Sequence, residues 1–421
     1  MTDYNDPAYR TARLKKRYAA EKRFRAYGLG AIATVGAILF FLLSSIVYTS
    51  LPAFTHHYVT LDITLSEDYI DVDTPADSNW QGAVRASLRD AFPDVKKRRE
   101  KRELYKFLSI GAADDVRDYA MKNPQDIGGT ISLPVTLSDD IDLVLKELID
   151  RNLPEDERIV KDRALGWLDR FEAEGRITRQ FSFQLFTNGD SREPELAGLK
   201  GALVGSLWTL LVTLMVSFPL GVLAAIYLQE IAPKNRATQF IEVNINNLAA
   251  VPSIVYGLLG LAVFINFFHL PRSAPLVGGL VLALMTLPRI IIPTRAAFAS
   301  IPPSIREAAL GVGASRIQVI MHHVLPLALP GILTGTIIGL AQAAGETAPL
   351  LMVGMMAFIV DVPTDVTAKA TVLPAQIYMW ANNPERAFVA RTSAGIVVLL
   401  SLLLVVNAAA IYMRKRFEKR W

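Results

Sequence analysis

The sequence predicts a mainly α-helical, polytopic membrane protein with six transmembrane helices and a mixed α/β extracytoplasmic domain inserted after the first helix. Hydrophobic residues make up 52% of the 421 residues although 20% are charged, which is typical of membrane spans joined to a water-soluble part. Uncharged stretches long enough to cross roughly 30 Å of hydrocarbon occur near the N-terminus and again beyond residue 200. Between them the chain is densely charged. These two compositions divide it into a membrane part and a soluble part.

The first transmembrane helix is predicted over residues 27–51, behind a basic cytoplasmic tail over residues 1–26. Residues 1–25 hold eight Lys or Arg against three acids, whereas Tyr27–Ser50 carries no charge. Residues 51–75 contain five acids and no Lys or Arg, so the rule that basic loops stay inside places the N-terminus in the cytoplasm. The basic and apolar regions are both long for a cleaved signal peptide, which favours a retained anchor.

Residues 52–199 are predicted to form a periplasmic mixed α/β domain. Apolar residues alternate over residues 59–65 and again over residues 131–137, and each stretch predicts a strand with one buried face. Three other segments have the periodicity of helices, namely Trp80–Phe92, Ile141–Ile149 and Asp162–Glu174.

This domain contains a basic run, Lys96–Arg99, followed by Lys101 and Arg102. Runs of this kind can bind nucleic acid, but Glu100 and Glu103 interleave with the basic residues and no set of stacking aromatic residues accompanies them. We therefore interpret the run as a solvated helix face and expect no nucleic-acid partner. Long translocated domains escape the positive-inside rule, so the run is compatible with a periplasmic position.

Residues 200–413 are predicted to hold five further transmembrane helices, before a basic cytoplasmic tail over residues 414–421. Eighteen Lys and Arg residues then fall in cytoplasmic segments and four in short outer loops, which supports this orientation. The four outer residues are Arg272, Lys369, Arg386 and Arg391. The uncharged stretches are Gly201–Gln229, Val243–Pro271, Ser273–Pro288 with a continuation to about Ala299, Ile317–Gly345 and Thr392–Met413.

Prolines and glycines are frequent in these stretches and predict interrupted helices. In lipid, an interrupted helix persists only beside other protein or a water-filled cavity, which favours a transporter or channel over a simple anchor. Gly331, Gly335 and Gly339 recur every four residues, so one face of that helix can approach a neighbour closely. The prolines lie at positions 219, 252, 288, 293, 330 and 349.

A polar segment, residues 300–326, lies between two apolar stretches and is predicted to be a cytoplasmic docking loop. Pro302 and Pro303 suit the first turn of a helix that continues to Leu310. The glycines at 311 and 313 are expected to end this helix, and Ala314–Val324 is expected to form a second helix that ends at Pro326.

The loop resembles the EAA loop of bacterial ABC importer permeases, the element that docks into a groove on the ATPase subunit. The matching residues are Glu307, Ala308, Ala309, Gly313, Leu325 and Pro326. One position departs from the family pattern, because His323 stands where an aliphatic residue is usual. Further along, Gly345–Leu351 (GETAPLL) is similar to the segment that marks phosphate importer permeases of the PstA type.

This resemblance covers residues 201–413 and implies a fold of the type I ABC importer permease kind. It implies three kinds of protein partner in the bacterial inner membrane system, in addition to the lipid bilayer: a second phosphate permease subunit, an ATPase dimer and a periplasmic phosphate-binding protein. ATP and Mg would be bound by the ATPase. The chain itself lacks a GxxxxGK[ST] motif, and we expect no catalytic residue, cofactor or metal site in it.

Four residues are candidates for the translocation pathway: Arg289, Gln342, Glu346 and Thr347. An ionisable group at membrane depth costs roughly 3 kcal/mol and is a functional hypothesis by default. Arg289 has forked donors for a phosphate dianion, and Glu346 is expected to pair with an Arg of this chain or of a partner. The alternative for both is a structural ion pair or a side chain that reaches the interface.

The pattern of PstA-like chains differs at three positions here. Many of them carry an Arg where this chain has Gln342, and an Arg and a Glu where it has Ile292 and Arg295. Arg289 lies one turn before Ile292, so we expect it to supply the displaced charge. Arg295, near the cytoplasmic end, is expected to be an interface anchor.

Two other functions are compatible with part of the sequence. A permease for another oxyanion, sulfate or molybdate, would use the same mechanism but would leave the resemblance of the GETAP segment unexplained. A membrane-anchored periplasmic sensor would explain residues 52–199 but not the docking loop.

Overall fold

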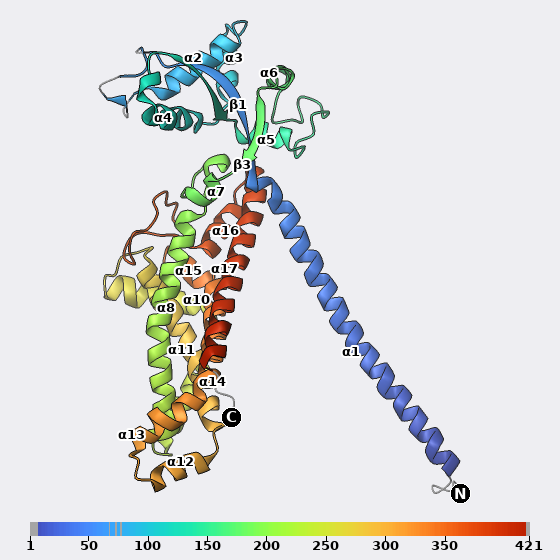
Figure 1. The fold of residues 1–421 in the computed structure, drawn as a ribbon, viewed down its shortest axis with the longest axis vertical. Coiled ribbons are helices and arrows are strands. Elements are labelled where there is room, and N and C mark those ends of the chain that lie inside the picture. The colour runs from blue at the N-terminus through green and yellow to red at the C-terminus, as the bar shows by residue number, and fades with distance from the viewer. Residues whose placement is uncertain (1–6, 67, 72–73, 76–77, 418–421) are drawn as a thin grey trace.

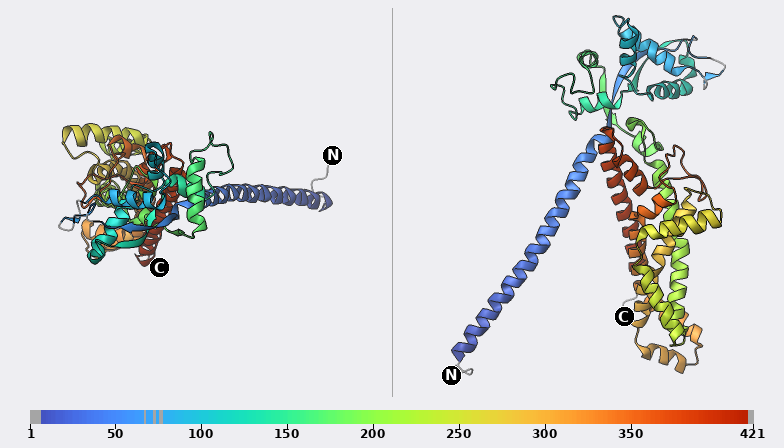
Figure 2. Two further views of the ribbon diagram at one scale, coloured as in Figure 1. Left: turned by 90° about the horizontal axis from the view of Figure 1, so that it is seen from above. Right: turned by 180° about the vertical axis from the view of Figure 1, so that it is seen from behind.

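The computed structural model describes residues 7–66, 68–71, 74–75 and 78–417, which form a long first helix, an α/β domain and a helical bundle (Figure 1). The α/β domain caps one end of the bundle. The docking loop and the described start of the first helix lie toward the opposite end (Figures 1 and 2). Lys419 and Arg420 of the predicted basic C-terminal tail lie outside the described residues.

Helix α1 runs without interruption from Pro7 to Ser50. The predicted basic tail is therefore helical from Pro7 onward and continues directly into the apolar span, because Ala, Lys, Arg and Glu are good helix formers and no proline interrupts them. The helix leans away from the bundle in both side views (Figures 1 and 2). Phe40 and Phe41 are more than 70% exposed, so lipid or another chain must cover this apolar surface.

The α/β domain is built on a three-stranded antiparallel sheet in the order β2-β1-β3. Strand β1 (Thr55–Thr64) pairs with β2 (Thr130–Thr136), and Leu61 lies opposite Leu133. Both predicted strands are confirmed. Strand β3 (Ile177–Phe181) pairs with the first half of β1; its mostly exposed residues explain why no buried face could be seen in its sequence.

Helices cover this sheet and enclose one hydrophobic core. Its largest buried residues include Leu61, Phe107, Leu137 and Phe171. The predicted helix over residues 141–149 is too long, because α5 ends at Leu145 and Glu147 adopts a φ of 57° that no α-helix allows. The helices are α2 (Trp80–Ala91), α3 (Arg98–Tyr105), α4 (Ala112–Lys122), α5 (Asp139–Leu145) and α6 (Asp162–Ala173), with short turns η1 (Leu51–Phe54) and η3 (Pro124–Asp126).

The bundle is centred on α11, which packs against α8 and α14. The small-residue face predicted on α14 does meet α11: a Cβ added at Gly331 would lie 2.5 Å from the Cβ of Ala297, and one at Gly335 would lie 2.8 Å from Pro293. The long elements are α8 (Lys200–Ile226) with π-turn η5 (Tyr227–Ile231), α9 (Arg236–Ala249), α10 (Ser253–Gly260) with η6 (Leu261–Phe267), α11 (Pro275–Ala299), α14 (Leu325–Gly345) and α17 (Ala387–Phe417). The short ones are α7 (Gln184–Thr187), η4 (Pro194–Leu196), α15 (Ala348–Met352) and α16 (Leu373–Ala381).

Within the described residues, five helices are long and apolar enough to cross a membrane, and a sixth crossing requires α9 and α10–η6 to count as one bent span. These two segments meet at 102°, because Pro252 lacks an N–H and disfavours helix in the residue before it. The span predicted over residues 243–271 is therefore not a straight helix. By contrast, α8, α11 and α14 continue through the prolines at 219, 288, 293 and 330, so the interruptions expected there do not occur.

Candidate functional site

The docking loop folds as a helix, a glycine corner and a second helix. Helix α12 spans Pro303–Gly311 with Pro303 in its first turn, and Gly313 follows with a φ of 89°, a conformation that favours glycine. Ser315 begins α13 (Arg316–Gln318) with a capping box: its hydroxyl accepts from the Gln318 N–H, and the Gln318 side chain accepts from the Ser315 N–H at 2.8 Å.

The second helix does not end at Pro326, which corrects the prediction from sequence. Helix α13 passes through the π-turn η7 (Val319–Val324) into α14, which reaches Gly345. A proline removes one hydrogen bond and crowds the carbonyl one turn before it. The wider π-turn lies at that place and relieves the crowding, so the docking loop is joined rigidly to a membrane helix.

The loop divides into a buried face and an exposed face. Ala309 is 5% exposed and packs in one cluster with Val319 and Ile320 of η7 and with Phe298 of α11. Glu307 and Ala308 are exposed. Beside them stand apolar side chains that the described chain leaves uncovered: Leu310 (48% exposed), Val312 (85%), Ile317 (70%) and Met321 (48%).

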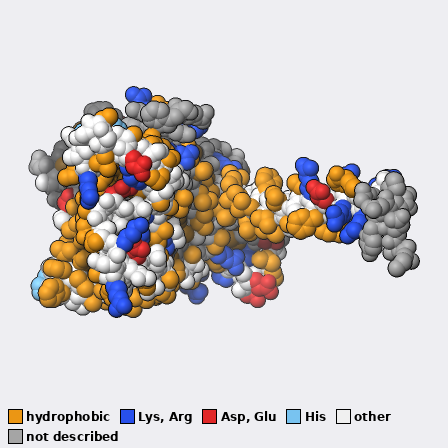
Figure 3. Space-filling view, turned by 90° about the horizontal axis from the view of Figure 1, so that it is seen from below, with side chains coloured by type: hydrophobic (Ala, Val, Ile, Leu, Met, Phe, Trp, Pro, Cys, Tyr) orange, Lys and Arg blue, Asp and Glu red, His pale blue; other side chains and the backbone are white. Residues whose placement is uncertain are grey.

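The space-filling view of this end shows hydrophobic side chains over much of the face, with basic and acidic side chains scattered among them (Figure 3). Apolar side chains around a helix with small exposed residues form a surface that another protein can approach closely. Leu325 and Pro326 are half-buried, and His322 and His323 are exposed. Of the six EAA-like residues, Glu307, Ala308 and Ala309 thus lie in α12, Leu325 and Pro326 begin α14, and Gly313 forms the corner that follows α12.

An ion pair that the sequence did not predict holds the loop to the membrane helices. Arg306 donates from Nε to Oε2 of Glu230 at 3.0 Å and from Nη2 to Oε1 at 2.5 Å. The same guanidinium donates to the carbonyls of Ile301 (2.8 Å) and Phe298 (2.9 Å) at the end of α11. We call this contact the Arg306 clamp. It ties α12 to η5 at the end of α8 and to α11, so a displacement of the loop must act on both helices.

The clamp left only a weak signal in the sequence. Glu230 directly follows the uncharged stretch of the second span, and Arg306 precedes Glu307 of the motif. Opposite charges at the ends of two predicted spans are compatible with a pairing, but their separation of 76 residues hides it.

The pathway candidates lie on α11, on α14 and in the break after α14. Arg289 faces α14, since a Cβ added at Gly339 would lie 3.7 Å from its Cβ. Its Nη1 atom is buried and has no hydrogen-bond partner among the described residues. An unpaired guanidinium nitrogen among membrane helices is a costly arrangement, and it leaves a cationic donor free for a ligand.

The other candidates are more exposed. Gln342 is exposed on α14, and Glu346 and Thr347 are half-buried in the two-residue break between α14 and α15. Among the residues that the structure describes, no ion pair involves Glu346. The pairing expected with an Arg of this chain is therefore not formed in the described part.

Two other arginines make contacts that the sequence did not predict. Nη2 of Arg295 lies 2.7 Å from Oε1 of Glu242 on α9. Arg391 does not belong to an outer loop. It is buried in α17 and donates to the carbonyls of Ala197 (2.9 Å) and Glu195 (3.0 Å), where it fixes the connection between domain and bundle.

Comparison with known proteins agrees with this arrangement. Residues 217–421 match the family described as "binding-protein-dependent transport system inner membrane component", and residues 11–155 match a domain of unknown function, DUF3333. The probable ABC transporter permease protein YqgI of Bacillus subtilis is 31% identical over 57% of this chain and 86% of its own length. The phosphate transport system permease protein PstA of Haemophilus influenzae is 30% identical over 57% of this chain and 82% of its own length.

Among solved structures, that of the MetNI methionine ABC transporter aligns with 51% of this chain and 95% of its own at 20% identity, with a TM-score of 0.42, a likeness too weak to carry an argument. The sequence relatives and the several apolar helices establish the family of this chain. The chain belongs to the binding-protein-dependent transport system inner membrane components, a family of multi-pass transporter permeases rather than enzymes, and within it to the ABC permeases of the PstA type.

Proposed function

We propose that the chain is one permease subunit of an ATP-driven phosphate importer. The observation that carries this proposal is the docking loop, which exposes Glu307, Ala308 and four uncovered apolar side chains while the Arg306 clamp ties it to α8 and α11. Such a loop is suited to receive the movement of an ATPase and to pass it to membrane helices. PstA relatives at about 30% identity favour phosphate as the substrate.

The proposed complex contains a second phosphate permease subunit, an ATPase dimer that binds ATP and Mg, and a periplasmic phosphate-binding protein. The N- and C-termini and the docking loop would face the cytoplasm, and residues 52–199 the periplasm. The position of the α/β domain at the end opposite the loop is compatible with this orientation (Figure 1).

Arg289 is the residue proposed to meet phosphate. Its buried, unpartnered Nη1 offers a charge-assisted hydrogen bond to an oxyanion. Gln342 lies on α14, which packs against α11, and Glu346 and Thr347 lie in the break that follows α14; all three would line the same path. Glu346 would then find its cationic partner on the second permease.

The test is uptake of radiolabelled phosphate, sulfate and molybdate in the source bacterium after deletion of this chain and complementation with variants. Wild-type chain should restore phosphate uptake alone, and Arg289→Ala should not restore it. If sulfate or molybdate uptake follows the chain instead, the phosphate assignment is wrong. Wild-type phosphate uptake with Arg289→Ala would remove that residue from the path.

The same strains test the coupling role of the loop. Glu307→Lys should abolish uptake and co-purification of the ATPase while the amount of chain in the membrane stays unchanged. A sensor, by contrast, would purify alone or with a kinase and would leave uptake of all three anions unaffected by its deletion.

A further inference from the structure

Helix α3 separates its charges onto two faces. Glu100 and Glu103 form ion pairs on one face. Glu100 lies 3.8 Å from Lys97 and 3.6 Å from Arg163. Glu103 lies 3.6 Å from Arg99 and 3.2 Å from Arg163. Their spacing places Arg98, Lys101 and Arg102 on the opposite face. The acids that interleave in the sequence therefore do not neutralise these three cations, of which Arg98 and Arg102 are exposed, as the predicted solvated helix face requires.

The three cations line a cavity of about 770 Å³, which we call the α3 pocket. Its basic wall also includes Arg85 and Lys106. Within the described part of the chain, Arg98, Lys101 and Arg102 take part in no ion pair. The facing wall is acidic and comes from the start of α5 and from η4: Asp139, Asp140, Glu193 and Glu195.

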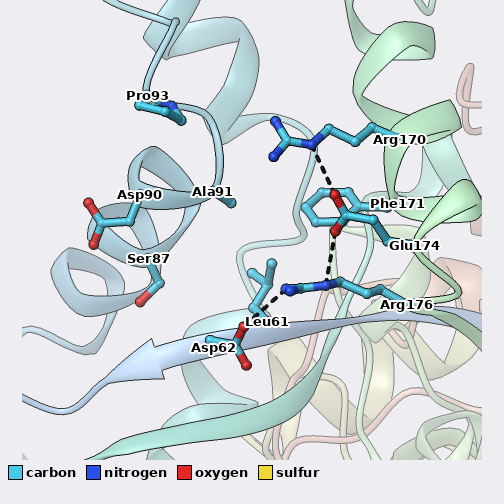
Figure 4. A pocket seen from close by; sticks show the side chains of 10 residues that line it. All are labelled: Leu61, Asp62, Ser87, Asp90, Ala91, Pro93, Arg170, Phe171, Glu174 and Arg176. Carbon is cyan, nitrogen blue, oxygen red and sulfur yellow. Dashed lines mark hydrogen bonds and ion pairs between the residues drawn. The ribbon is translucent and has the colours of Figure 1, made fainter.

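A second cavity of the same domain, by contrast, has arginines that pair with acids of its own wall. This cavity, of about 670 Å³, is drawn in Figure 4, where Arg170 and Arg176 both point toward Glu174. The two Nε atoms lie 3.0 Å from its carboxylate oxygens, and Arg176 also lies 3.2 Å from Asp62. Its cations thus pair with acids of its own wall, whereas Arg98, Lys101 and Arg102 of the α3 pocket take part in no ion pair among the described residues.

We propose that the α3 pocket binds a small phosphomonoester that carries an ammonium or hydroxyl group. The phosphate would lie against Arg98, Lys101 and Arg102, whose donors suit its oxygens. The ammonium or hydroxyl group would face Asp139 and Asp140. The proposal is independent of the transport function, because the pocket lies entirely outside the membrane helices.

The shape and charge of the pocket favour this ligand over two others. A cavity of this volume has the size of a small-molecule site, and inorganic phosphate would fill little of it and leave the acids unmatched. An acidic protein surface would be attracted by one wall and repelled by the other. The acids also repel one another: burial, with Glu195 and Asp140 nearby, raises the pKa of Asp139 to about 7. A donor group beside them relieves that repulsion.

The experiment is equilibrium binding of O-phosphoethanolamine, glycerol 3-phosphate and inorganic phosphate to the full chain purified in detergent. O-phosphoethanolamine should bind saturably and more tightly than inorganic phosphate. Arg98→Ala with Lys101→Ala should weaken its binding by about tenfold or more, as expected for lost hydrogen bonds to a charged group. Arg99→Ala, which removes a paired cation one residue away, and Arg170→Ala in the second cavity are matched controls and should leave binding unchanged.

Asp139→Asn tests whether the ammonium end of the ligand, and not its phosphate, lies against the acidic wall. It should weaken O-phosphoethanolamine while it leaves inorganic phosphate unchanged or slightly tighter. Saturable binding that is equal for all three probes and insensitive to Asp139→Asn would overturn the phosphomonoester in favour of a plain oxyanion site. No saturable binding of any probe, or binding insensitive to Arg98 and Lys101, would overturn the site itself. Near-ultraviolet circular dichroism of each variant checks that the domain is folded.

Discussion

The helical bundle and the α/β domain place their charges differently. In the bundle, ion pairs join helices near one end, as Arg306–Glu230 and Arg295–Glu242 do, and a buried nitrogen of Arg289 has no partner among the described residues. In the domain, a buried cluster around Asp142 fixes β1 to α5, while three cations of the α3 pocket take part in no ion pair within the described part of the chain. Charge in the bundle thus links elements that are proposed to move together. Charge in the domain either builds the fold or remains free for a ligand.

The largest expected effect comes from breaking the Arg306 clamp. Arg306→Ala leaves the Glu230 carboxylate, whose side chain is 9% exposed, without its cation, and loss of one partner of a buried pair costs about 3 kcal/mol. Phosphate uptake should fall by about tenfold or more, since 1.4 kcal/mol already corresponds to a factor of 10. Arg316→Ala, which removes an exposed arginine of the same loop, should retain uptake.

The charge-swapped pair Arg306→Glu with Glu230→Arg separates coupling from stability. It should recover part of the uptake that each single variant loses, because the ion pair is restored in reverse. Unchanged uptake in Arg306→Ala would contradict a coupling role for the clamp.

The next effect is on the stability of the α/β domain. Asp142 accepts from the His57 N–H at 3.0 Å and lies 2.8 Å from His57 Nδ1, 3.2 Å from His56 Nδ1 and 2.5 Å from Lys146 Nζ. Burial alone would raise its pKa, but hydrogen bonds from the two histidines and the charge of Lys146 hold it well below the usual value. Asp142→Asn should destabilise the domain by about 3 kcal/mol, because Lys146 is left buried without a counterion.

Limited proteolysis of the full chain in detergent measures this loss as faster cleavage within the domain. Asp118→Asn is the control, since the Asp118 side chain is 63% exposed and lies 3.2 Å from Arg117 on the surface. Equal cleavage rates for Asp142→Asn and wild type would show that the cluster contributes little to the fold.

Sequence patterns predicted the two regions unequally, for physical reasons. The spans from α8 onward, the strands β1 and β2 and the helix–corner–helix of the loop follow from local periodicity, turn residues and length, which a single sequence displays. The Arg306 clamp and the Asp142 cluster join residues 76 and 85 positions apart, and no local pattern encodes such pairs. The basic run of α3 forms an exposed helix face, as predicted, but the sorting of its acids and of three of its cations onto opposite faces becomes visible only once the helix is built.

A smaller effect is expected at the glycine corner of the loop. A Cβ added at Gly311 or Gly313 would meet no atom of a more distant described residue within 4 Å, but only Gly313 of the two has a positive φ, 89°. Gly313→Ala should therefore cost about 1 kcal/mol or more through backbone strain, whereas Gly311→Ala should be neutral or slightly stabilising in its helix. Uptake and ATPase co-purification should fall for Gly313→Ala alone. Equal loss in both variants would instead indicate that the ATPase contacts the space beside both glycines.

The smallest effect is a pH dependence of the α/β domain. Burial and the nearby charges of Glu195 and Asp140 raise the pKa of Asp139 to about 7, from 3.8. The folded state therefore binds more protons than the unfolded state between these two values, and stability falls as the pH rises through that window.

Asp142 acts in the opposite sense, because its lowered pKa makes stability fall only when the pH drops below about 4. A comparison of pH 5.5 with pH 8 thus lies above the range in which Asp142 acts and spans the raised pKa of Asp139. In the wild-type chain, the domain should be cleaved faster at pH 8 than at pH 5.5 after correction for the pH profile of the protease. Asp139→Asn should reduce the corresponding difference in the free energy of unfolding by about 1 kcal/mol. An unchanged difference in Asp139→Asn would show that Asp139 does not carry the slope; Asp140, Glu195 and Glu385, whose pKa values burial also raises, would be the next residues to substitute.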